Sequence, residues 1–255
     1  MSQALVLLLG MLSGAEQRPI TTPRELLAAM HARYEGKWYR TLTFLQRNTE
    51  HHPDGTVEHS TWREWLQAPG QLRIEFQPAD SGNGVLFASD SVFSFRHDSL
   101  LGSRPFVHPL LVLGFDVYAQ PVERVVAQLQ QPPRVFDLSV LSEGTWDGRP
   151  VWIVGAKAAD QHTRQFWVDK ERLVFVRMLE PAPRDTAKTA DTRFNKYSAM
   201  GGGWVAAEVE FLVDGQQQFL EQYDEIQTNV ALPAALWEPR QWKAARSNRA
   251  GPSGN

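Results

Sequence analysis

The sequence contains no cysteine. Disulfide bonds, thiol nucleophiles and thiolate metal sites are therefore excluded together, although the absence is compatible with any cellular compartment. A chain of 255 residues must then be held by its apolar core, and a hydrophobic content of 42% is enough to build one. All-β folds often reach this length as a single domain, so we expect one domain.

Blocks of like charge are also missing. The 26 basic and 29 acidic residues are interspersed and leave a formal net charge of -3. Binding to nucleic acid needs basic side chains clustered on one face. We therefore expect no nucleic-acid partner.

The sequence has few catalytic signatures. It lacks the Gly-x-Ser-x-Gly motif that presents a serine nucleophile. The glycine clusters at residues 81–84 and 201–203 lead into strand patterns, without the lysine and helix start that follow a phosphate loop, so we interpret them as turns. We expect no enzymatic activity and no cofactor.

One group of histidines has the composition of a metal site. His51, His52, Asp54 and His59 are close in sequence, but they straddle a proline and an Asp-Gly turn. Zinc ligands normally have a tighter pair spacing on a rigid element, so a solvated hairpin tip is favoured over a metal site. His108 stands before a proline, where a capping or packing role is favoured over that of a base.

The first residues bear on location. Residues 4–12 form an apolar run too short to span a bilayer, and residues 13–15 are the small side chains that a signal peptidase recognises. The pattern predicts a cleaved signal peptide at residues 1–15 and a soluble product. No lysine or arginine precedes the run, and a buried N-terminal helix or a mis-assigned start is the alternative.

Strand patterns dominate residues 38–76, where apolar side chains recur at every second residue, as a half-buried strand requires. The Ala-Pro-Gly sequence at residues 68–70 separates two of the runs and has the chemistry of a tight turn. We expect an antiparallel hairpin here. The in-phase side chains are Trp38, Leu42 and Phe44, then Trp62 and Leu66, then Leu72, Ile74 and Phe76.

Two segments interrupt this period of two. Residues 21–36 start with threonine and proline and predict an amphipathic helix, and residues 105–131 predict a helical insertion. Strand patterns then continue, with hairpin turns at Asp-Gly 147–148 and 214–215. The chain should form a meander of about ten or eleven strands, a loop or short helical segment at residues 228–239, and a disordered tail at residues 241–255.

Large apolar side chains are more numerous than one short helix can cover. The chain has nine tryptophans and thirteen phenylalanines, several of them in phase on strands. A curved sheet covered by helices can enclose an apolar cavity, although any single residue could equally fill a closed core. The apolar run LLVLGF at residues 110–115 is too short to span a core and has the character of a lid.

The order of segments resembles a known family. An amphipathic first helix precedes GKWYRTLTFLQR, WREWLQAPGQLRIEF and GVLFASDSVFSF, and the helical insertion precedes a meander that ends in EVEFLVDGQQQFLEQYDEI. Over roughly residues 23–239 this order resembles the outer-membrane lipoprotein-sorting proteins, the LolA-like periplasmic carriers. The resemblance implies a mainly β fold, an unclosed antiparallel β-barrel of about 10–11 strands with helices over its concave face, in a domain at residues 21–240.

The resemblance also implies a function. Such a carrier is periplasmic and shelters the acyl chains of lipids or lipoproteins on their way to the outer membrane, with membrane-bound donor and acceptor proteins as partners. Each methylene removed from water contributes roughly 0.8 kcal/mol, so an apolar cavity can bind a chain without any chemistry. In the archetypal carriers an arginine precedes the proline of the strand turn, and here this position is Ala68. Either the transfer or the cargo then differs.

We predict the residues that hold the acyl chain from the in-phase apolar positions, although a slip of one residue on any strand would exchange the two faces. An envelope lipid sensor or regulatory binding protein of the same fold is the alternative function, and a hydrolase is the least favoured; we expect a monomer. The predicted cavity residues are Leu42, Phe44, Trp62, Leu66, Leu72, Ile74, Phe76, Phe93 and Phe95, and the predicted lid residues are Leu110, Leu111, Leu113 and Phe115.

Overall fold

The structure, a computed structural model, describes residues 19–247. The predicted signal peptide at residues 1–15 lies outside the described residues. Within the described range, no helix is both long and apolar enough to cross a membrane. The α-helices are α1 (Pro23–Tyr34), α2 (Pro109–Gly114), α3 (Val122–Leu129) and α4 (Trp242–Ser247), and the 3-10 helices are η1 (Ala79–Ser81), η2 (Asp116–Tyr118), η3 (Ala234–Trp237) and η4 (Pro239–Gln241).

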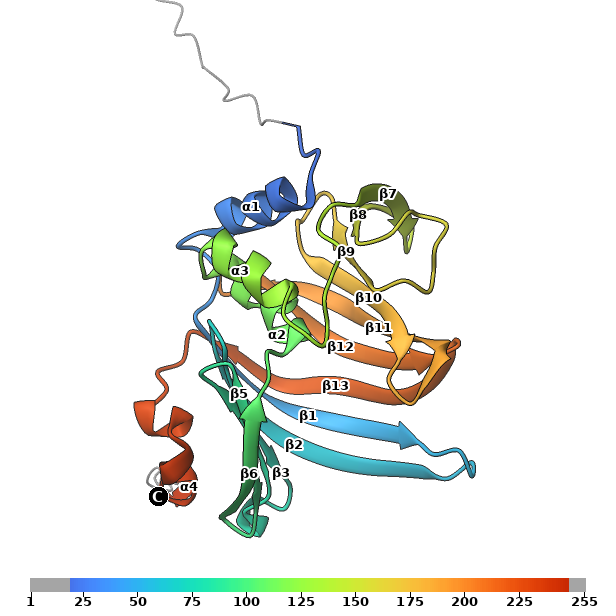
Figure 1. The fold of residues 1–255 in the computed structure, drawn as a ribbon. Helices are drawn as coiled ribbons and strands as arrows, with labels where there is room; N and C mark the ends of the chain where they lie inside the picture. The colour runs from blue at the N-terminus through green and yellow to red at the C-terminus, as the bar shows by residue number, and fades with distance from the viewer. Residues whose placement is uncertain (1–18, 248–255) are drawn as a thin grey trace, which may run out of the picture.

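A single antiparallel sheet of thirteen strands runs in the order β6-β5-β4-β3-β2-β1-β13-β12-β11-β10-β9-β8-β7. Two meanders are joined where β1 pairs with β13. The edge strands β6 and β7 do not pair with each other, so the predicted unclosed barrel is confirmed (Figure 1). The strands are β1 (Thr41–His51), β2 (Val57–Gln67), β3 (Gln71–Phe76), β4 (Gly84–Ala88), β5 (Ser91–Arg96), β6 (Ser99–Pro105), β7 (Leu141–Trp146), β8 (Arg149–Val154), β9 (Gln165–Asp169), β10 (Phe175–Ala182), β11 (Asp185–Met200), β12 (Gly203–Val213) and β13 (Gln216–Thr228).

The strand count exceeds the predicted ten or eleven. No strand was predicted at β6, whose residues are exposed from end to end. A strand without a buried face has no reason to alternate apolar and polar side chains, so it lacks the pattern by which the other strands are recognised. Its position is set by its pairing with β5.

The predicted first helix is confirmed as α1, which begins with a capping box. The Thr22 hydroxyl accepts a hydrogen bond from the Glu25 backbone N–H at 3.2 Å, and the Glu25 carboxylate accepts one from the Thr22 backbone N–H at 3.0 Å. Leu26, Leu27 and Met30 are fully buried on the inner side of the helix. They fix α1 against the helical insertion, which forms α2, η2 and α3 as predicted.

The tight turns have the predicted backbone. Asp147 and Gly148 have φ angles of 48° and 72°, and Asp214 and Gly215 have 48° and 77°. Positive φ at two successive residues is the geometry of a two-residue hairpin turn whose twist matches that of its strands. These turns therefore set the register of β7 on β8 and of β12 on β13.

Each face of the sheet carries its own apolar cluster. Helices α1, α2 and α3 cover the concave face, where they contribute to the main core (Figure 1). On the outer face, the C-terminal segment η3–η4–α4 packs against β3, β4 and β5 with Leu236, Trp237 and Trp242. The predicted disorder of residues 241–255 is therefore wrong for residues 242–247: Trp242 is 2% exposed and its ring stacks on that of Phe95 at 4.2 Å between centroids. Residues 248–255 lie outside the described range.

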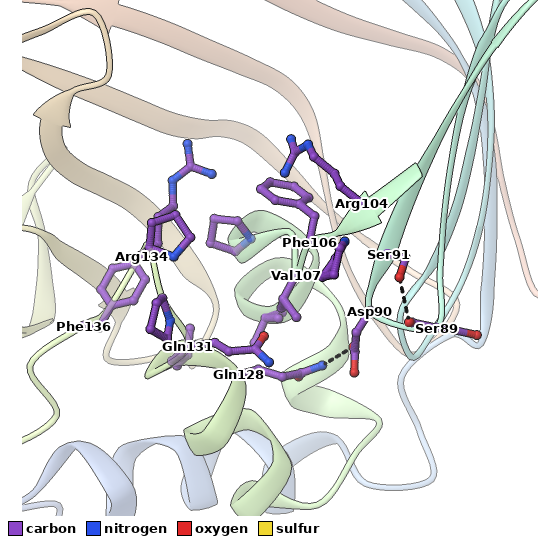
Figure 2. A pocket seen from close by; sticks show the side chains of 16 residues that line it. Ser89, Asp90, Ser91, Arg104, Phe106, Val107, Gln128, Gln131, Arg134 and Phe136 are labelled. Atoms are coloured by element: carbon purple, nitrogen blue, oxygen red, sulfur yellow. Dashed lines mark hydrogen bonds between the residues drawn. The ribbon is translucent and has the colours of Figure 1, made fainter. Parts of the chain in front are cut away.

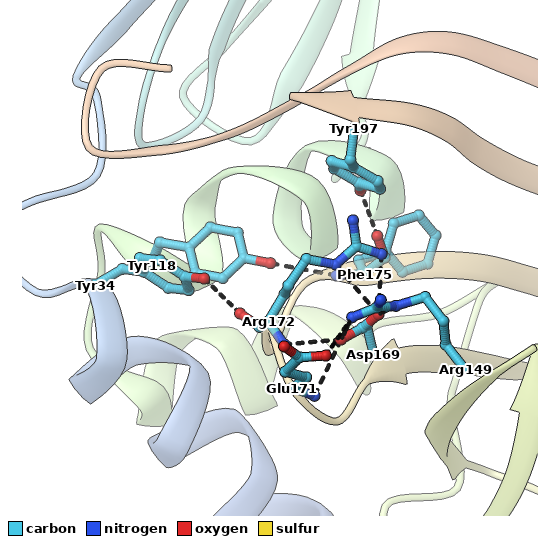
Figure 3. A network of polar contacts seen from close by, with 8 residues as sticks. All are labelled: Tyr34, Tyr118, Arg149, Asp169, Glu171, Arg172, Phe175 and Tyr197. Carbon is cyan, nitrogen blue, oxygen red and sulfur yellow. Dashed lines mark hydrogen bonds and ion pairs between the residues drawn. The ribbon is translucent and has the colours of Figure 1, made fainter. Parts of the chain in front are cut away.

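A polar network joins the helices to the second meander (Figure 3). Burial would raise the pKa of Asp169, but hydrogen bonds from Arg149 and Arg172 outweigh it and lower that pKa to about 2. The Tyr34 hydroxyl on α1 donates to the Arg172 carbonyl oxygen, and the Tyr118 hydroxyl on η2 accepts from the Phe175 backbone N–H at 3.3 Å. The region of the turn between β9 and β10 thus anchors both α1 and the helical insertion.

Candidate functional site

A cavity of about 130 Å³ lies between the concave face of the sheet and α2. Its walls are formed by β1, β2 and β3 from the first meander and by β11, β12 and β13 from the second, and α2 closes one side. Eleven of its sixteen lining residues are apolar, which is typical of a site for an apolar ligand.

Most of the predicted cavity residues meet at this place. From the sheet, Phe44, Trp62, Leu66, Leu72 and Ile74 line the cavity. They come together because β1, β2 and β3 are neighbours whose registers place Leu42 opposite Leu66 and Leu66 opposite Leu72. Their contact with an acyl chain stays a prediction. The cavity is also lined by Phe194, Val209 and Phe211 from β11 and β12, which the sequence did not single out.

The predicted lid residues also divide into those that line the cavity and one that does not. Leu110, Leu111 and Phe115 line the cavity from α2 and the residue after it. Leu113 is fully buried on the other side of α2 and belongs to the core, as does Leu42 at the start of β1. Phe76 lies outside the cavity lining, and its ring is 5.1 Å from that of Trp62.

The prediction for Phe93 and Phe95 is wrong, because both side chains lie on the outer face. Register pairs Leu72 with Phe87 and Phe87 with Val92, so the concave face of β5 carries Val92 and the alternate residues turn outward. Phe93 and Phe95 instead pack in the outer-face cluster under Trp242. Two phenylalanines in phase establish a common face without showing which face it is.

Five polar residues line the cavity, and the sequence analysis placed none of them there, although it named His108 as a capping or packing residue. They are Gln46, Glu64, His108, Glu221 and Tyr223. A signal was present for two: Gln46 is in phase with Phe44, and Glu64 stands between Trp62 and Leu66 on the same face. A polar side chain at an inward position of a strand can indicate a functional site, because buried polar groups usually have a function or a partner.

The two carboxyl groups of the cavity have shifted pKa values. Burial raises the pKa of Glu64 well above its ordinary value, and the nearby charge of Glu221 raises it further. Burial also raises the pKa of Glu221 to about 7, although hydrogen bonds from Tyr223 and Gln46 lower it. The Tyr223 hydroxyl donates to Glu221 Oε2 at 2.7 Å. Near neutral pH, this end of the cavity therefore holds both acceptors and exchangeable protons.

His108 forms the N-terminal cap of α2. Its Nδ1 accepts a hydrogen bond from the Leu110 backbone N–H at 3.3 Å, as predicted for a capping residue. Burial, together with the charge of Arg134, lowers the pKa of His108 to about 4, so the ring is neutral at physiological pH. It adds no positive charge to the cavity.

The strand turn at residues 68–70 is tied to the helical insertion. The Gly70 backbone N–H donates to Asp116 Oδ1 at 2.9 Å, and Asp116 is 2% exposed. Burial raises the pKa of Asp116 to about 7, against the hydrogen bond from Gly70, which lowers it. Ala68 packs against the main core at the same turn. This hydrogen bond thus links the position of the strand turn to that of the helical insertion.

Two other hollows have larger volumes. One, of about 400 Å³, lies between the ends of β5 and β6 and the segment after α3 (Figure 2). Arg104 and Arg134 stand over the Phe106 ring there, and Arg134 also pairs with Glu180 at 3.3 Å. The other, of about 870 Å³, lies among polar hairpin tips near His51 and His52. Both have a more polar lining than the cavity under α2, so the concave cavity is the candidate site. Across residues 19–247, no group of three or more His, Cys, Asp or Glu side chains could hold a metal ion.

No protein-family model matches the sequence, and comparison with curated protein sequences gives no match. Solved structures do match. A DUF1329 family protein from Desulfovibrio piger has 16% identity and a TM-score of 0.56, over 85% of this chain and 95% of that one. A domain named for outer-membrane lipoprotein sorting from Vibrio parahaemolyticus has 13% identity and a TM-score of 0.57, over 86% and 97%. A LolA superfamily protein from Nitrosomonas europaea has 10% identity and a TM-score of 0.53, over 86% and 98%.

These similarities extend over nearly the whole described chain and over the whole of each neighbour. At such low identity they establish the fold, and the LolA-like fold predicted from the order of segments is confirmed.

Proposed function

We propose that this chain is a periplasmic carrier that shelters the acyl chains of a lipid or lipoprotein in the concave cavity during transport to the outer membrane. The observation that carries the proposal is the cavity itself, walled by aromatic and aliphatic side chains from both meanders and closed by α2. The LolA-like fold supports it, because one of the structural neighbours is named for lipoprotein sorting.

The cavity volume indicates a closed state. Pockets that hold drug-sized ligands enclose roughly 300–1,000 Å³, and this cavity has about 130 Å³. A long acyl chain therefore needs α2 and the following residues to move away from the sheet. Leu110, Leu111 and Phe115 would then pack on the chain instead of on the opposite wall, which replaces one apolar contact by another.

The alternatives have less support. The cavity lining contains no serine, threonine or cysteine that His108 could activate as a nucleophile, and we propose a binding protein rather than an enzyme. A lipid sensor that docks on a partner would need apolar surface outside the cavity. Among the described residues the large exposed apolar side chains are Val57, Leu100, Leu101 and Val135, and only the two leucines are neighbours in sequence. Interaction patches usually exceed a few hundred Å².

The first test is mass spectrometry of gently purified protein, which should reveal a co-purifying lipid. In parallel, Ile74→Asp, at a half-buried position of the cavity wall, should abolish the fluorescence gain of Nile red on binding, because the new carboxylate would lie in the chain's path. Leu101→Asp is the matched control: this leucine is 61% exposed on β6 and the change should leave binding intact. Absence of lipid together with no uptake of Nile red by the native protein would refute the carrier function.

A further inference from the structure

The polar side chains at the cavity carry ionisable groups of one sign only. Glu64 enters from β2 and Glu221 from β13, and no lysine or arginine is among the lining residues. The other titratable groups that face the two carboxyls are Tyr223, from β13, and His108, which precedes α2. The ring of His108 is neutral at physiological pH, so no cation of the lining compensates the negative charge that Glu221, with a pKa of about 7, carries when it ionises.

Glu64 is the group that the fold leaves without compensation. The residue is 4% exposed, and its side chain faces the cavity between those of Trp62 and Leu66. No residue in the described range donates a hydrogen bond to its carboxyl group; burial and the charge of Glu221 both disfavour its ionised form. A ligand whose headgroup donates hydrogen bonds would supply the partners that this carboxyl group lacks.

Glu221 is held in place but keeps capacity for a ligand. It accepts from the Tyr223 hydroxyl at 2.7 Å and from the Gln46 side chain. Gln46 is itself fixed by donating to Asn48 Oδ1 at 2.7 Å, and it is 1% exposed. A carboxylate has about four acceptor sites, so further donors can be accommodated. The Tyr223 ring stacks on Phe44 at 4.2 Å, which places this polar end directly beside the apolar wall.

We propose that Glu64 and Glu221 form a headgroup site that selects cargo whose acyl or alkyl chain ends in a primary ammonium group. This inference rests on the proposed carrier function and adds the chemical class of the cargo. An ammonium group has three donors and one positive charge, which match two carboxyls that have no cation beside them. A carboxylate or phosphate headgroup would add like charge at the same place, and like charges at short range are repelled strongly in a buried site.

The test compares three probes with the same chain: dodecylamine, dodecanol and dodecanoate, each displacing Nile red from the native protein at neutral pH. Binding of dodecanol reports the apolar cavity, and the difference between headgroups reports the ammonium site. Dodecylamine should bind about tenfold tighter than dodecanol, as expected for one charge-assisted hydrogen bond, and dodecanoate should bind more weakly than dodecanol. The preference for the amine should fall as the pH falls through about 7, because Glu221 then becomes protonated while the amine stays charged.

Single-residue variants test whether Glu64 and Glu221 cause the preference for dodecylamine. Glu64→Gln and Glu221→Gln should each reduce binding of dodecylamine to the level of dodecanol and leave dodecanol unchanged. Glu58→Gln, at an exposed position of the same strand as Glu64, should alter neither. Equal affinities of the native protein for amine and alcohol, or tighter binding of dodecanoate, would overturn the ammonium site while the carrier function stood. If none of the three chains bound, both proposals would fail.

Discussion

Two arginines on adjacent strands differ chiefly in burial. Arg73 on β3 is fully buried on the outer face, where it pairs with Glu75 at 2.6 Å, donates to the Trp242 carbonyl oxygen at 2.7 Å and lies 3.7 Å from the centre of the Trp242 ring. Arg63 on β2 pairs with Glu225, also at 2.6 Å, but its side chain is 30% exposed. The ion pair of Arg73 should therefore contribute much more to the free energy of unfolding than the ion pair of Arg63.

At the scale of the residue, we predict that Arg73→Ala lowers the free energy of unfolding by about 3–5 kcal/mol, because it removes one partner of a buried pair. It should also release the C-terminal segment from the outer face. Arg63→Ala should cost about 1 kcal/mol or less, as exposed pairs do. Urea denaturation of both variants measures the difference, and similar losses in the two would contradict the assignment of Arg73 as the anchor of the segment.

In the helical insertion, the predicted lid has few polar ties to the sheet. One tie joins Asp116 on η2 to the turn between β2 and β3, through the Gly70 backbone N–H. A second joins α3 to the turn between β4 and β5, where Asp90 accepts from Arg124 at 2.8 Å and from Gln128 at 3.1 Å. A third is the hydrogen bond from the Phe175 backbone N–H on β10 to Tyr118 on η2. Most of the remaining contact is apolar, so we expect the predicted lid to open at the cost of a few hydrogen bonds.

Removing the Asp116 tie should make the lid open more often. We predict that Asp116→Ala speeds the uptake and release of Nile red about fivefold, which corresponds to the loss of one hydrogen bond of typical strength. Asp116→Asn keeps an acceptor oxygen for Gly70 and should retain native exchange rates. Stopped-flow fluorescence measures both, and an equal change in the two variants would show that the hydrogen bond does not hold the lid.

At the scale of the whole molecule, the buried titratable groups predict an unusual pH dependence of stability. The pKa values of Glu64, Glu221 and Asp116 are raised in the folded state, so the folded protein binds more protons than the unfolded chain above about pH 4 and stability falls as pH rises towards about 7. The pKa of His108 is lowered to about 4, which acts in the opposite direction between about pH 6.5 and 4. The three carboxyl groups together contribute more to the pH dependence than His108 does, so the net effect is a loss of stability as the pH rises.

We therefore predict a higher melting temperature at about pH 5 than at about pH 8, followed by a decline below about pH 4. There the unfolded chain begins to bind a proton at Asp169, whereas in the folded state Arg149 and Arg172 hold the pKa of this group at about 2. Calorimetry across this range gives the profile. The Glu221→Gln variant should have a shallower slope between pH 5 and 8. A melting temperature that rose steadily from pH 5 to 8 would contradict the assigned shifts.

Strand alternation and turn chemistry were readable in the sequence, since both depend on neighbouring residues. The in-phase positions of Leu66, Leu72 and Ile74 and the intervening turn predicted a hairpin with one apolar face, and this hairpin is part of the cavity wall. The order of such segments was enough to predict the LolA-like fold. It was not enough to find the acidic side chains of the cavity, because Glu64 and Glu221 line one cavity only when β1 lies between β2 and β13.

The sequence by itself thus determined which side chains share a face, because side chains alternate along any strand whatever surrounds it. The tertiary structure alone decided which face is the inner one. Phe93 and Phe95 are as well phased as Leu72 and Ile74, yet they lie on the outer face because the register from β3 to β5 turns them there and Trp242 covers them. Burial by a distant segment leaves no trace in the local pattern of either strand, and so the two faces become distinguishable only after the chain has folded.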